Sequence, residues 1–204
     1  MIKNIIFDFD GVILDSVPVK TEAFRVLFDN YDKNNVDIFI DYHLLNGGVS
    51  RYSKIRYFFE QLLGQDISEQ NVIQLAEEYS DLTKRELAQQ QYIIQDTITF
   101  IKQNYQTCRM HIASGAAEDD LNFICDTLDL TQYFFSIHGS PQSKDKLVKE
   151  IIESNQYIKD ETILIGDSIN DLDAANINNI VFYGYNNSTL ARYNYIDTFM
   201  DFDK

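Results

Sequence analysis

Two aspartates, Asp8 and Asp10, stand one residue apart at the end of a short apolar run, and two more, Asp167 and Asp171, follow another such run late in the chain. Carboxylates gathered in one place repel one another unless a cation or shared protons compensate for their charge. Such oxygen ligands suit Mg²⁺, which binds one or two carboxylates together with water and phosphate oxygens. Asp8, Asp10 and Asp167 are therefore predicted to form a magnesium site.

A carboxylate at such a site can also attack phosphorus and form an aspartyl-phosphate. Two carboxylates divide the work, since one attacks while its neighbour gives a proton to the leaving oxygen and later takes one from water. Phosphoryl transfer also needs positive charge and hydrogen-bond donors around the phosphate oxygens. The chain offers for this the amine of Lys144, the hydroxyl of Ser114 and the backbone N–H groups of Phe9, Gly11 and Gly115.

The elements that would position these residues alternate along the chain. Short apolar runs predict strands at 5–7, 109–113, 133–139, 162–166 and 179–184, with a last edge strand at 195–202. Helical spacing of apolar residues predicts helices at 96–105, 116–130, 144–155 and 170–178. This alternation is typical of a parallel sheet with helices on both faces, whose ligands bind beyond the carboxyl ends of the strands. Asp8, Ser114 and Asp167 stand at such ends, and Lys144 opens a helix.

Residues 15–90 show no convincing strand pattern and are predicted to be mostly helical. Helices are expected at 17–31, at 52–64 and at 68–90, the last with Ser68 as N-cap, and 36–45 is interpreted as a short helix or an extended piece. The predicted fold class is α/β, with a Rossmann-like parallel sheet, helices on both faces and an inserted all-helical cap domain. The α/β core domain would comprise 1–14 and 91–204, and the cap domain 15–90.

The composition argues against several classes of partner. The chain has 204 residues and a net charge of −15, from 17 basic and 32 acidic residues, which disfavours nucleic acid and anionic membranes. The first residues do not resemble a signal peptide, and no apolar run approaches the roughly 20 residues of a membrane span. The expected location is the cytoplasm, where Cys108 and Cys125 would be reduced thiols in or near the core. The sequence indicates no oligomeric state.

Four segments, DFDGVILDS, IASGA, SPQSKDKL and GDSINDLDAA, resemble in type and order the four motifs of the haloacid dehalogenase-like (HAD) phosphatase superfamily. With the region between them, the resemblance covers about residues 1–182. The chain is most similar to the branch with a helical cap after the first motif, which holds phosphoglycolate-phosphatase-like and β-phosphoglucomutase-like proteins. The resemblance implies Mg²⁺ as cofactor and a small phosphorylated molecule as substrate.

The resemblance also implies a role for each acidic residue. Asp8 would be the nucleophile. Asp10 would be the general acid/base, and its backbone carbonyl would be a ligand of Mg²⁺. Asp167 would complete the metal site, and Asp171 would support it through water or by orienting Lys144.

Two further motif residues would handle the phosphate. The resemblance implies that Ser114 holds it and that Lys144 neutralises both the nucleophile and the phosphate. Lys146 is the alternative lysine, because the segment lacks the KP of many relatives, although SKDKL fits a shorter variant with the lysine at the helix start. Ser114 is also expected to cap the following helix, with Glu118 and Asp119 in the first turn, a position that attracts anions.

The segment NGGVSRY (46–52) resembles the cap loop that reaches over the active site in these relatives. Arg51, Ser50 and Lys20 are the candidates for contacting the non-phosphate end of the substrate. Each also has a structural interpretation, in which Ser50 caps the following helix, Arg51 is a surface charge and Lys20 faces solvent. The three histidines are predicted to be structural: His43, His111 and His138.

The leading hypothesis is a Mg²⁺-dependent phosphatase acting on a small phosphorylated metabolite such as a sugar phosphate. The alternative is a phosphomutase of the β-phosphoglucomutase kind, which the GVSR-like loop favours, although those relatives tend to carry a histidine where this chain has Lys20. Haloacid dehalogenase activity itself is a third hypothesis, and it needs neither Asp10 nor Asp167. The fourth is a non-catalytic phosphate-binding or regulatory protein that keeps the fold.

Overall fold

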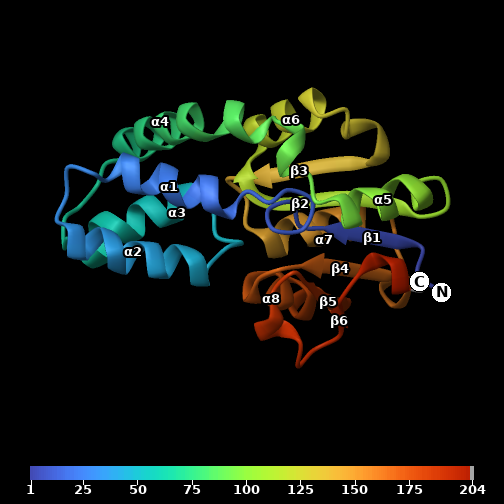
Figure 1. Ribbon diagram of the computed structural model, residues 1–204. Coiled ribbons are helices and arrows are strands. Elements are labelled where there is room, and N and C mark those ends of the chain that lie inside the picture. The colour runs from blue at the N-terminus through green and yellow to red at the C-terminus, as the bar shows by residue number, and fades with distance from the viewer. Residues whose placement is uncertain (203–204) are drawn as a thin grey trace.

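A computed structural model describes residues 1–202 and places a six-stranded parallel sheet at the centre of the molecule (Figure 1). The strands lie in the order β3-β2-β1-β4-β5-β6. They are β1 (Asn4–Phe7), β2 (Arg109–Ala117), β3 (Ser136–Ser140), β4 (Thr162–Gly166), β5 (Val181–Tyr185) and β6 (Tyr195–Ile196). All five neighbouring pairs are parallel, which confirms the predicted α/β fold class.

Strand β1 is buried on both faces, which explains the apolar run at residues 5–7 within it. Because side chains alternate along a strand, Ile5 and Phe7 point to one face and Ile6 to the other. Ile5 and Phe7 pack with residues of α5 (Gln95–Asn104) and α6 (Glu118–Thr127). On the opposite face Ile6 packs with α7 (Lys144–Ser154) and α8 (Ile169–Asn178), so helices cover both sides of the sheet.

Four helices follow β1 before the chain returns to the sheet: α1 (Val17–Leu27), α2 (Lys33–Leu45), α3 (Arg51–Arg56) and α4 (Glu69–Leu87). Figure 1 shows this α1–α4 segment beyond the end of the sheet to which the arrowheads of the strands point. Its aromatic residues form a cluster of their own, in which the rings of Phe28 and Phe58 stack 3.9 Å apart. The predicted division of the chain into a core and a cap domain stays a prediction.

Several predicted elements in this segment can be compared directly with the structure. The stretch 36–45, interpreted as helical or extended, belongs to helix α2, and α3 continues into a π-helical turn, Tyr57–Leu62. Ser68 caps α4 by accepting a hydrogen bond from the backbone N–H of Asn71, as predicted. Among the described residues, no helix is both long and apolar enough to cross a membrane.

Two predicted features are wrong. Ser114 does not cap a helix, because β2 keeps pairing with β3 beyond a register shift and α6 begins only at Glu118, after Ala117. The predicted edge strand 195–202 is a strand only at Tyr195–Ile196. It gives way to a 3₁₀ turn, Phe199–Asp201, because the ring of Phe199 turns inward and packs in the core under β1.

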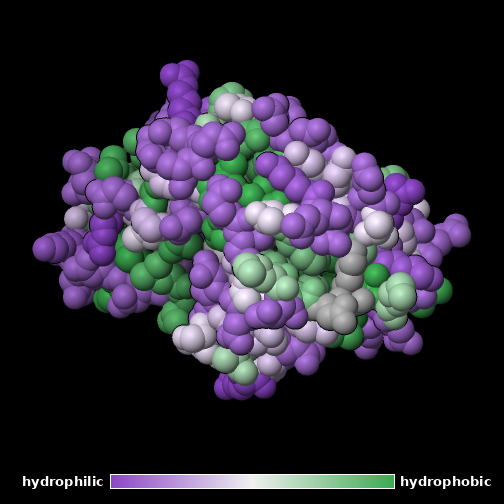
Figure 2. All heavy atoms as spheres, turned by 45° about the vertical axis from the view of Figure 1, so that its right-hand side comes forward, coloured by the Kyte–Doolittle hydropathy of each residue, from purple (hydrophilic) through white to green (hydrophobic). Residues whose placement is uncertain are grey.

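The cysteines and two histidines are structural, as expected. Cys108 and Cys125 are both buried, and Cys125 is a free thiol. The buried ring of His111 contacts the hydroxyls of Ser136 and Tyr157, and His138 contacts Ser136. Hydrophilic residues cover most of the face drawn in Figure 2.

Candidate active site

Three carboxylates converge at the carboxyl ends of the two central strands. Asp8 follows β1, Asp167 follows β4 and Asp171 lies in the first turn of α8, and one oxygen of each lies within 4.8 Å of the others. The pairing of β1 with β4 sets this geometry, since the backbone N–H of Asp8 donates to the carbonyl of Ile165 at 2.8 Å. Of the three residues predicted to form this site, Asp8 and Asp167 lie together, whereas the carboxylate of Asp10 lies outside the group and that of Asp171 lies in it.

Lys144, at the start of α7, supplies the positive charge beside these carboxylates. Its amine lies 2.8 Å from Oδ1 of Asp8 and also pairs with Asp171. Burial alone would lower the pKa of Lys144, but the charges of Asp171 and Asp8 outweigh it and hold the pKa above its ordinary value. Lys146 is exposed on the next part of the helix. The geometry therefore places Lys144, and not Lys146, at the site.

The electrostatics of Asp8 and Asp167 point to a cation. Burial and the charge of Asp171 raise the pKa of Asp8 to about 7. Burial and the charge of Asp8 raise the pKa of Asp167 to about 8. Carboxylates in this position hold protons at neutral pH unless a cation offsets their repulsion. Gly11 keeps room around them, because a Cβ at this residue, whose φ is +75°, would lie 2.0 Å from Oδ2 of Asp167.

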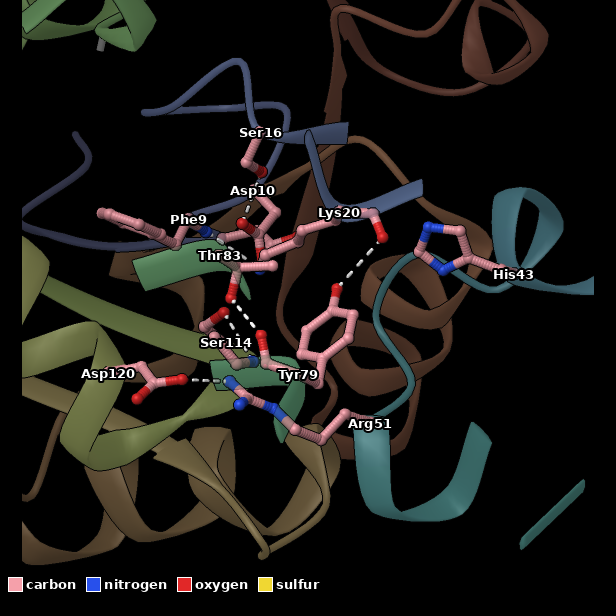
Figure 3. Close-up of polar contacts among 12 residues, drawn as sticks. Phe9, Asp10, Ser16, Lys20, His43, Arg51, Tyr79, Thr83, Ser114 and Asp120 are labelled. Atoms are coloured by element: carbon pink, nitrogen blue, oxygen red, sulfur yellow. Dashed lines mark hydrogen bonds and ion pairs between the residues drawn. The ribbon is translucent and has the colours of Figure 1, made fainter. Parts of the chain in front are cut away.

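The carboxylate of Asp10 lies outside this cluster. It accepts hydrogen bonds from one side chain of α1 and from one side chain of the residue just before α1. Ser16 Oγ donates to one carboxylate oxygen and Lys20 Nζ to the other, both at 2.5 Å (Figure 3). Burial acts to raise the pKa of Asp10, but the charge of Lys20 and these hydrogen bonds hold it below its ordinary value. Lys20 is therefore an ion-pair partner of Asp10, and its interpretation as a solvent-facing lysine is wrong.

The loop between α2 and α3 reaches the end of β2, where Ser114 is fully buried. A Cβ on Gly115 would lie 2.5 Å from the carbonyl oxygen of Gly48, so these two backbones can approach only because residue 115 is glycine. A Cβ on Gly48 would lie 3.4 Å from the amine of Lys144. The loop thus covers the catalytic edge of the sheet.

Arg51 is buried, so its interpretation as a surface charge is wrong. Its guanidinium pairs with Asp120 of α6 at 2.5 Å and donates to Ser80 of α4, as Figure 3 shows in part. The same group lies over the ring of Tyr79. Arg51 therefore ties three helices together, whereas a contact with substrate stays a prediction. Ser50 caps α3, since its hydroxyl accepts from the N–H of Ser53.

A model of the haloacid dehalogenase-like hydrolase family matches residues 5–184. The chain belongs to the haloacid dehalogenase-like hydrolase family. The predicted resemblance is confirmed, and as a member of this family the protein is an enzyme of the hydrolase class.

Solved structures with the same fold include three from bacteria. The β-phosphoglucomutase of Clostridium difficile superposes with a TM-score of 0.79 at 18% identity, covering 100% of this chain and 94% of that one. CbbY of Rhodobacter sphaeroides, in complex with xylulose-(1,5)bisphosphate, gives 0.78 at 14% identity, with 98% and 96% covered. A predicted phosphoglycolate phosphatase of Haemophilus somnus 129PT gives 0.73 at 13% identity, again with 98% and 96% covered.

In this haloacid dehalogenase-like hydrolase, sequence reasoning missed the buried Lys54 and treated its partner His43 as a structural histidine. The amine of Lys54 on α3 lies 2.9 Å from Nδ1 of His43 on α2. Burial and the charge of Lys20 lower the pKa of Lys54 to about 7, and burial with the charge of Lys54 lowers that of His43 to about 3. The helical period could have indicated that Lys54 is buried, because it lies one turn before the buried Phe58 and therefore on the same helix face.

Two asparagines after β5 were also missed. The side-chain amide of Asn186 donates to the carbonyl of Gly11, and that of Asn187 donates to the carbonyl of Asp167. These hydrogen bonds hold the two loops that carry the acidic residues. The position of both asparagines at the carboxyl end of a strand could have identified them.

A cavity of about 810 Å³ lies between the α1–α4 segment and the carboxyl edge of the sheet. Its wall on the sheet side includes Asp10, Asp167 and Gly115. On the helical side it includes Lys54 and His43. The cavity therefore runs from the carboxyl edge of the sheet to these two residues of α2 and α3.

Replacing Lys54 by methionine is expected to stabilise the folded protein. The folded-state pKa of about 7 lies below the ordinary 10.5, so the cost of burying the ammonium is fully present below pH 7 and disappears as the pH rises to 10.5. The free energy of unfolding should rise by about 2 kcal/mol near pH 6 and by less near pH 9, as measured by urea denaturation. A gain that increased with pH would contradict this expectation.

Proposed function

We propose that this hydrolase is a Mg²⁺-dependent phosphatase that cleaves a small phosphorylated metabolite through an aspartyl-phosphate on Asp8. The observation that carries the proposal is the position of Asp8. This carboxylate lies 2.8 Å from the amine of Lys144 and within 4.8 Å of an oxygen of Asp167, at the end of a central strand, and Asp167 in turn lines a large cavity. The family match and the similarity to structures of a phosphatase and a phosphomutase support this chemistry.

The residues of the site fit Mg²⁺. Asp8, Asp167 and the backbone carbonyl of Asp10 would hold the ion, with Asp171 supporting the site by fixing Lys144. The raised pKa values of Asp8 and Asp167 are the signature of carboxylates that a cation would stabilise. When bound, the ion neutralises charge on these carboxylates and on the phosphate oxygens.

In the first step an oxygen of Asp8 attacks phosphorus, and the bond from phosphorus to the leaving oxygen breaks. Lys144, the hydroxyl of Ser114 and the backbone N–H groups of Phe9, Gly11 and Gly115 hold the remaining phosphate oxygens. The N–H of Phe9 already donates to Oδ1 of Asp8 at 2.7 Å, which orients the nucleophile.

Asp10 handles the proton in both steps. It gives a proton to the leaving oxygen and later takes one from the water that hydrolyses the aspartyl-phosphate. Its lowered pKa suits the second task, since the carboxylate is ionised at neutral pH. For the first step the ionised carboxylate must first take up a proton, and the Lys20 ammonium, which donates to Oδ2 of Asp10, supplies it. The proton that Asp10 takes from water in the second step returns to Lys20.

The α1–α4 segment acts as the cap of the site, so that residues 15–90 form one functional unit and residues 1–14 with 91–204 the other. The loop that approaches Gly115 and Lys144 supports this arrangement. A closed cap excludes bulk water and thereby strengthens each charge interaction around the phosphate. Arg51, Ser50 and Lys20 remain candidates for the substrate-facing wall, in positions at which Arg51 and Lys20 already have carboxylate partners.

A panel of phosphorylated metabolites tests the proposal. With Mg²⁺ present the enzyme should release inorganic phosphate from one class of them, and removal of the metal with a chelator should reduce the rate at least about 100-fold. The rate should return when Mg²⁺ is added back. Release that continues undiminished in the chelator would contradict the metal requirement, and absence of release across the panel would contradict the phosphatase assignment.

The second candidate is a phosphomutase. The loop at residues 46–52 lies over the site, and the fold is similar to that of a β-phosphoglucomutase. A hexose 1-phosphate supplied with a catalytic amount of the corresponding bisphosphate separates the two functions. Accumulation of the 6-phosphate isomer supports a mutase, whereas free phosphate supports a phosphatase.

A further inference from the structure

Lys54 carries a buried amine that has no carboxylate partner. Its exposed fraction is 3%, and none of the ion pairs among residues 1–202 includes it. The one side-chain hydrogen bond that it makes within this part of the chain is to Nδ1 of His43. Buried charged groups are normally paired, because removing an isolated charge from water costs roughly several kcal/mol of free energy.

His43 adds a second polar atom without a partner. Its ring is buried, and Nε2 makes no hydrogen bond with any described residue. Burial lowers the pKa of the ring, so it is neutral, and a neutral imidazole that accepts at Nδ1 carries its hydrogen on Nε2. Figure 3 shows the ring pointing toward Lys20, on the side of Asp10. Within the part of the chain that the structure describes, the pair thus presents an ammonium without a counter-charge and an N–H group without an acceptor.

Both residues line the cavity that leads to Asp10 and Asp167. Two other cations on its wall, the partly buried Lys20 and the buried Arg51, already have partners, since Lys20 pairs with Asp10 and Arg51 pairs with Asp120. Lys54 is therefore the buried cation of this wall whose counter-charge is missing from the described chain. Asp167, which lies within 4.8 Å of Asp8, lines this cavity, so a phosphate held between these two carboxylates would leave the rest of its molecule within the cavity.

We propose that Lys54 and His43 bind an oxyanion at the non-phosphate end of the substrate, so that the enzyme acts on phosphorylated metabolites bearing a second anionic group. This inference rests on the proposed function and specifies its substrate class. A carboxylate or a second phosphate supplies the counter-charge for the Lys54 ammonium and the acceptor for the His43 N–H, in charge-assisted hydrogen bonds. A polyol end would supply acceptors but would leave the ammonium without a counter-charge.

Pairs of substrates that differ in the second group test the proposal. The first pair is 3-phosphoglycerate and glycerol 3-phosphate, and the second is fructose 1,6-bisphosphate and fructose 6-phosphate. In at least one pair the wild-type enzyme should favour the member with the second anionic group by 10-fold or more in kcat/KM, the size of one charge-assisted contact. The pair that shows the preference identifies the anion as a carboxylate or as a phosphate.

The variant Lys54→Met should reduce this ratio to near one, since methionine fills the space of the lysine stem without its charge. Lys159→Met is the matched control, because it removes the same charge from an exposed turn, and it should keep the ratio. A wild-type enzyme without the preference, or a Lys54→Met enzyme that retains it, would overturn the inference.

Equilibrium binding separates this inference from the proposed function. In an Asp8→Asn background, calorimetric titration should show tighter binding of the member with the second anionic group, again by 10-fold or more. Lys54→Met should abolish the difference. Hydrolysis that favours glycerol 3-phosphate and fructose 6-phosphate overturns the inference and leaves the phosphatase intact. Binding that depends on Lys54 without any hydrolysis overturns the phosphatase and leaves the inference intact. Equal binding of both members in each pair overturns the inference.

Discussion

An Asp8→Asn enzyme is expected to release phosphate at least about 10⁴-fold more slowly than the wild-type enzyme. The amide of asparagine has nearly the shape of the carboxylate but cannot attack phosphorus. The fold should survive, since the change removes a buried charge whose pKa is already raised by burial and by the charge of Asp171. Thermal unfolding should confirm this, and phosphate release from an aryl phosphate with Mg²⁺ measures the loss.

The matched control is Asp160→Asn, which makes the same substitution at an exposed turn and should leave the rate unchanged. An Asp8→Asn enzyme with near-wild-type turnover would show that another group is the nucleophile. Deamidation of the new asparagine restores the wild-type residue, so mass spectrometry of the sample should accompany any residual rate.

Lys144→Met is expected to affect both stability and turnover. The change leaves the carboxylates of Asp8 and Asp171 without the cation that lies between them, and loss of one partner of a buried ion pair costs about 3 kcal/mol of unfolding free energy. The pKa of Asp8, already about 7 with the lysine in place, then rises further, so less of the nucleophile is ionised at neutral pH. Turnover at pH 7 should decrease at least about 100-fold.

The turnover rate of Lys144→Met should also depend on pH in a defined direction. Because the pKa of Asp8 is raised, the rate of Lys144→Met should recover in part as the pH increases above 7, a change larger than in the wild-type enzyme. Lys146→Met is the matched control, since this exposed lysine lies two residues away and contacts none of the three carboxylates. Equal loss in both variants would contradict the assignment of Lys144.

Much of the catalytic edge could be predicted from the sequence because it depends on topology alone. The apolar runs before Asp8 and Asp167 are buried strands, and neighbouring parallel strands bring their carboxyl ends together. The start of α7 at Lys144 follows from the same alternation of strand and helix. These features require no knowledge of how individual side chains pack.

Contacts made between helices could not be predicted in the same way. Arg51 forms an ion pair with Asp120, which lies 69 residues further along the chain. Lys54 contacts His43 only because the fold brings their positions on α3 and α2 together. Helical periodicity says which face of a helix is buried, but not which helix it meets or at what depth. Ser114 shows a related limit, since a strand and a helix start can share the same local residues until sheet pairing decides between them.

The buried aromatic cluster of the α1–α4 segment shares no buried residue with the clusters that pack against the two faces of the sheet. The packing changes that follow a mutation in the helical wall of the cavity therefore stay within the α1–α4 cluster. The strand ends that carry Asp8 and Asp167 keep their register. Under the proposed function, substitutions in the helical wall can thus change which metabolite is accepted while the residues that carry out the reaction stay the same. In this architecture the capacity to acquire new substrates is a property of the packing itself.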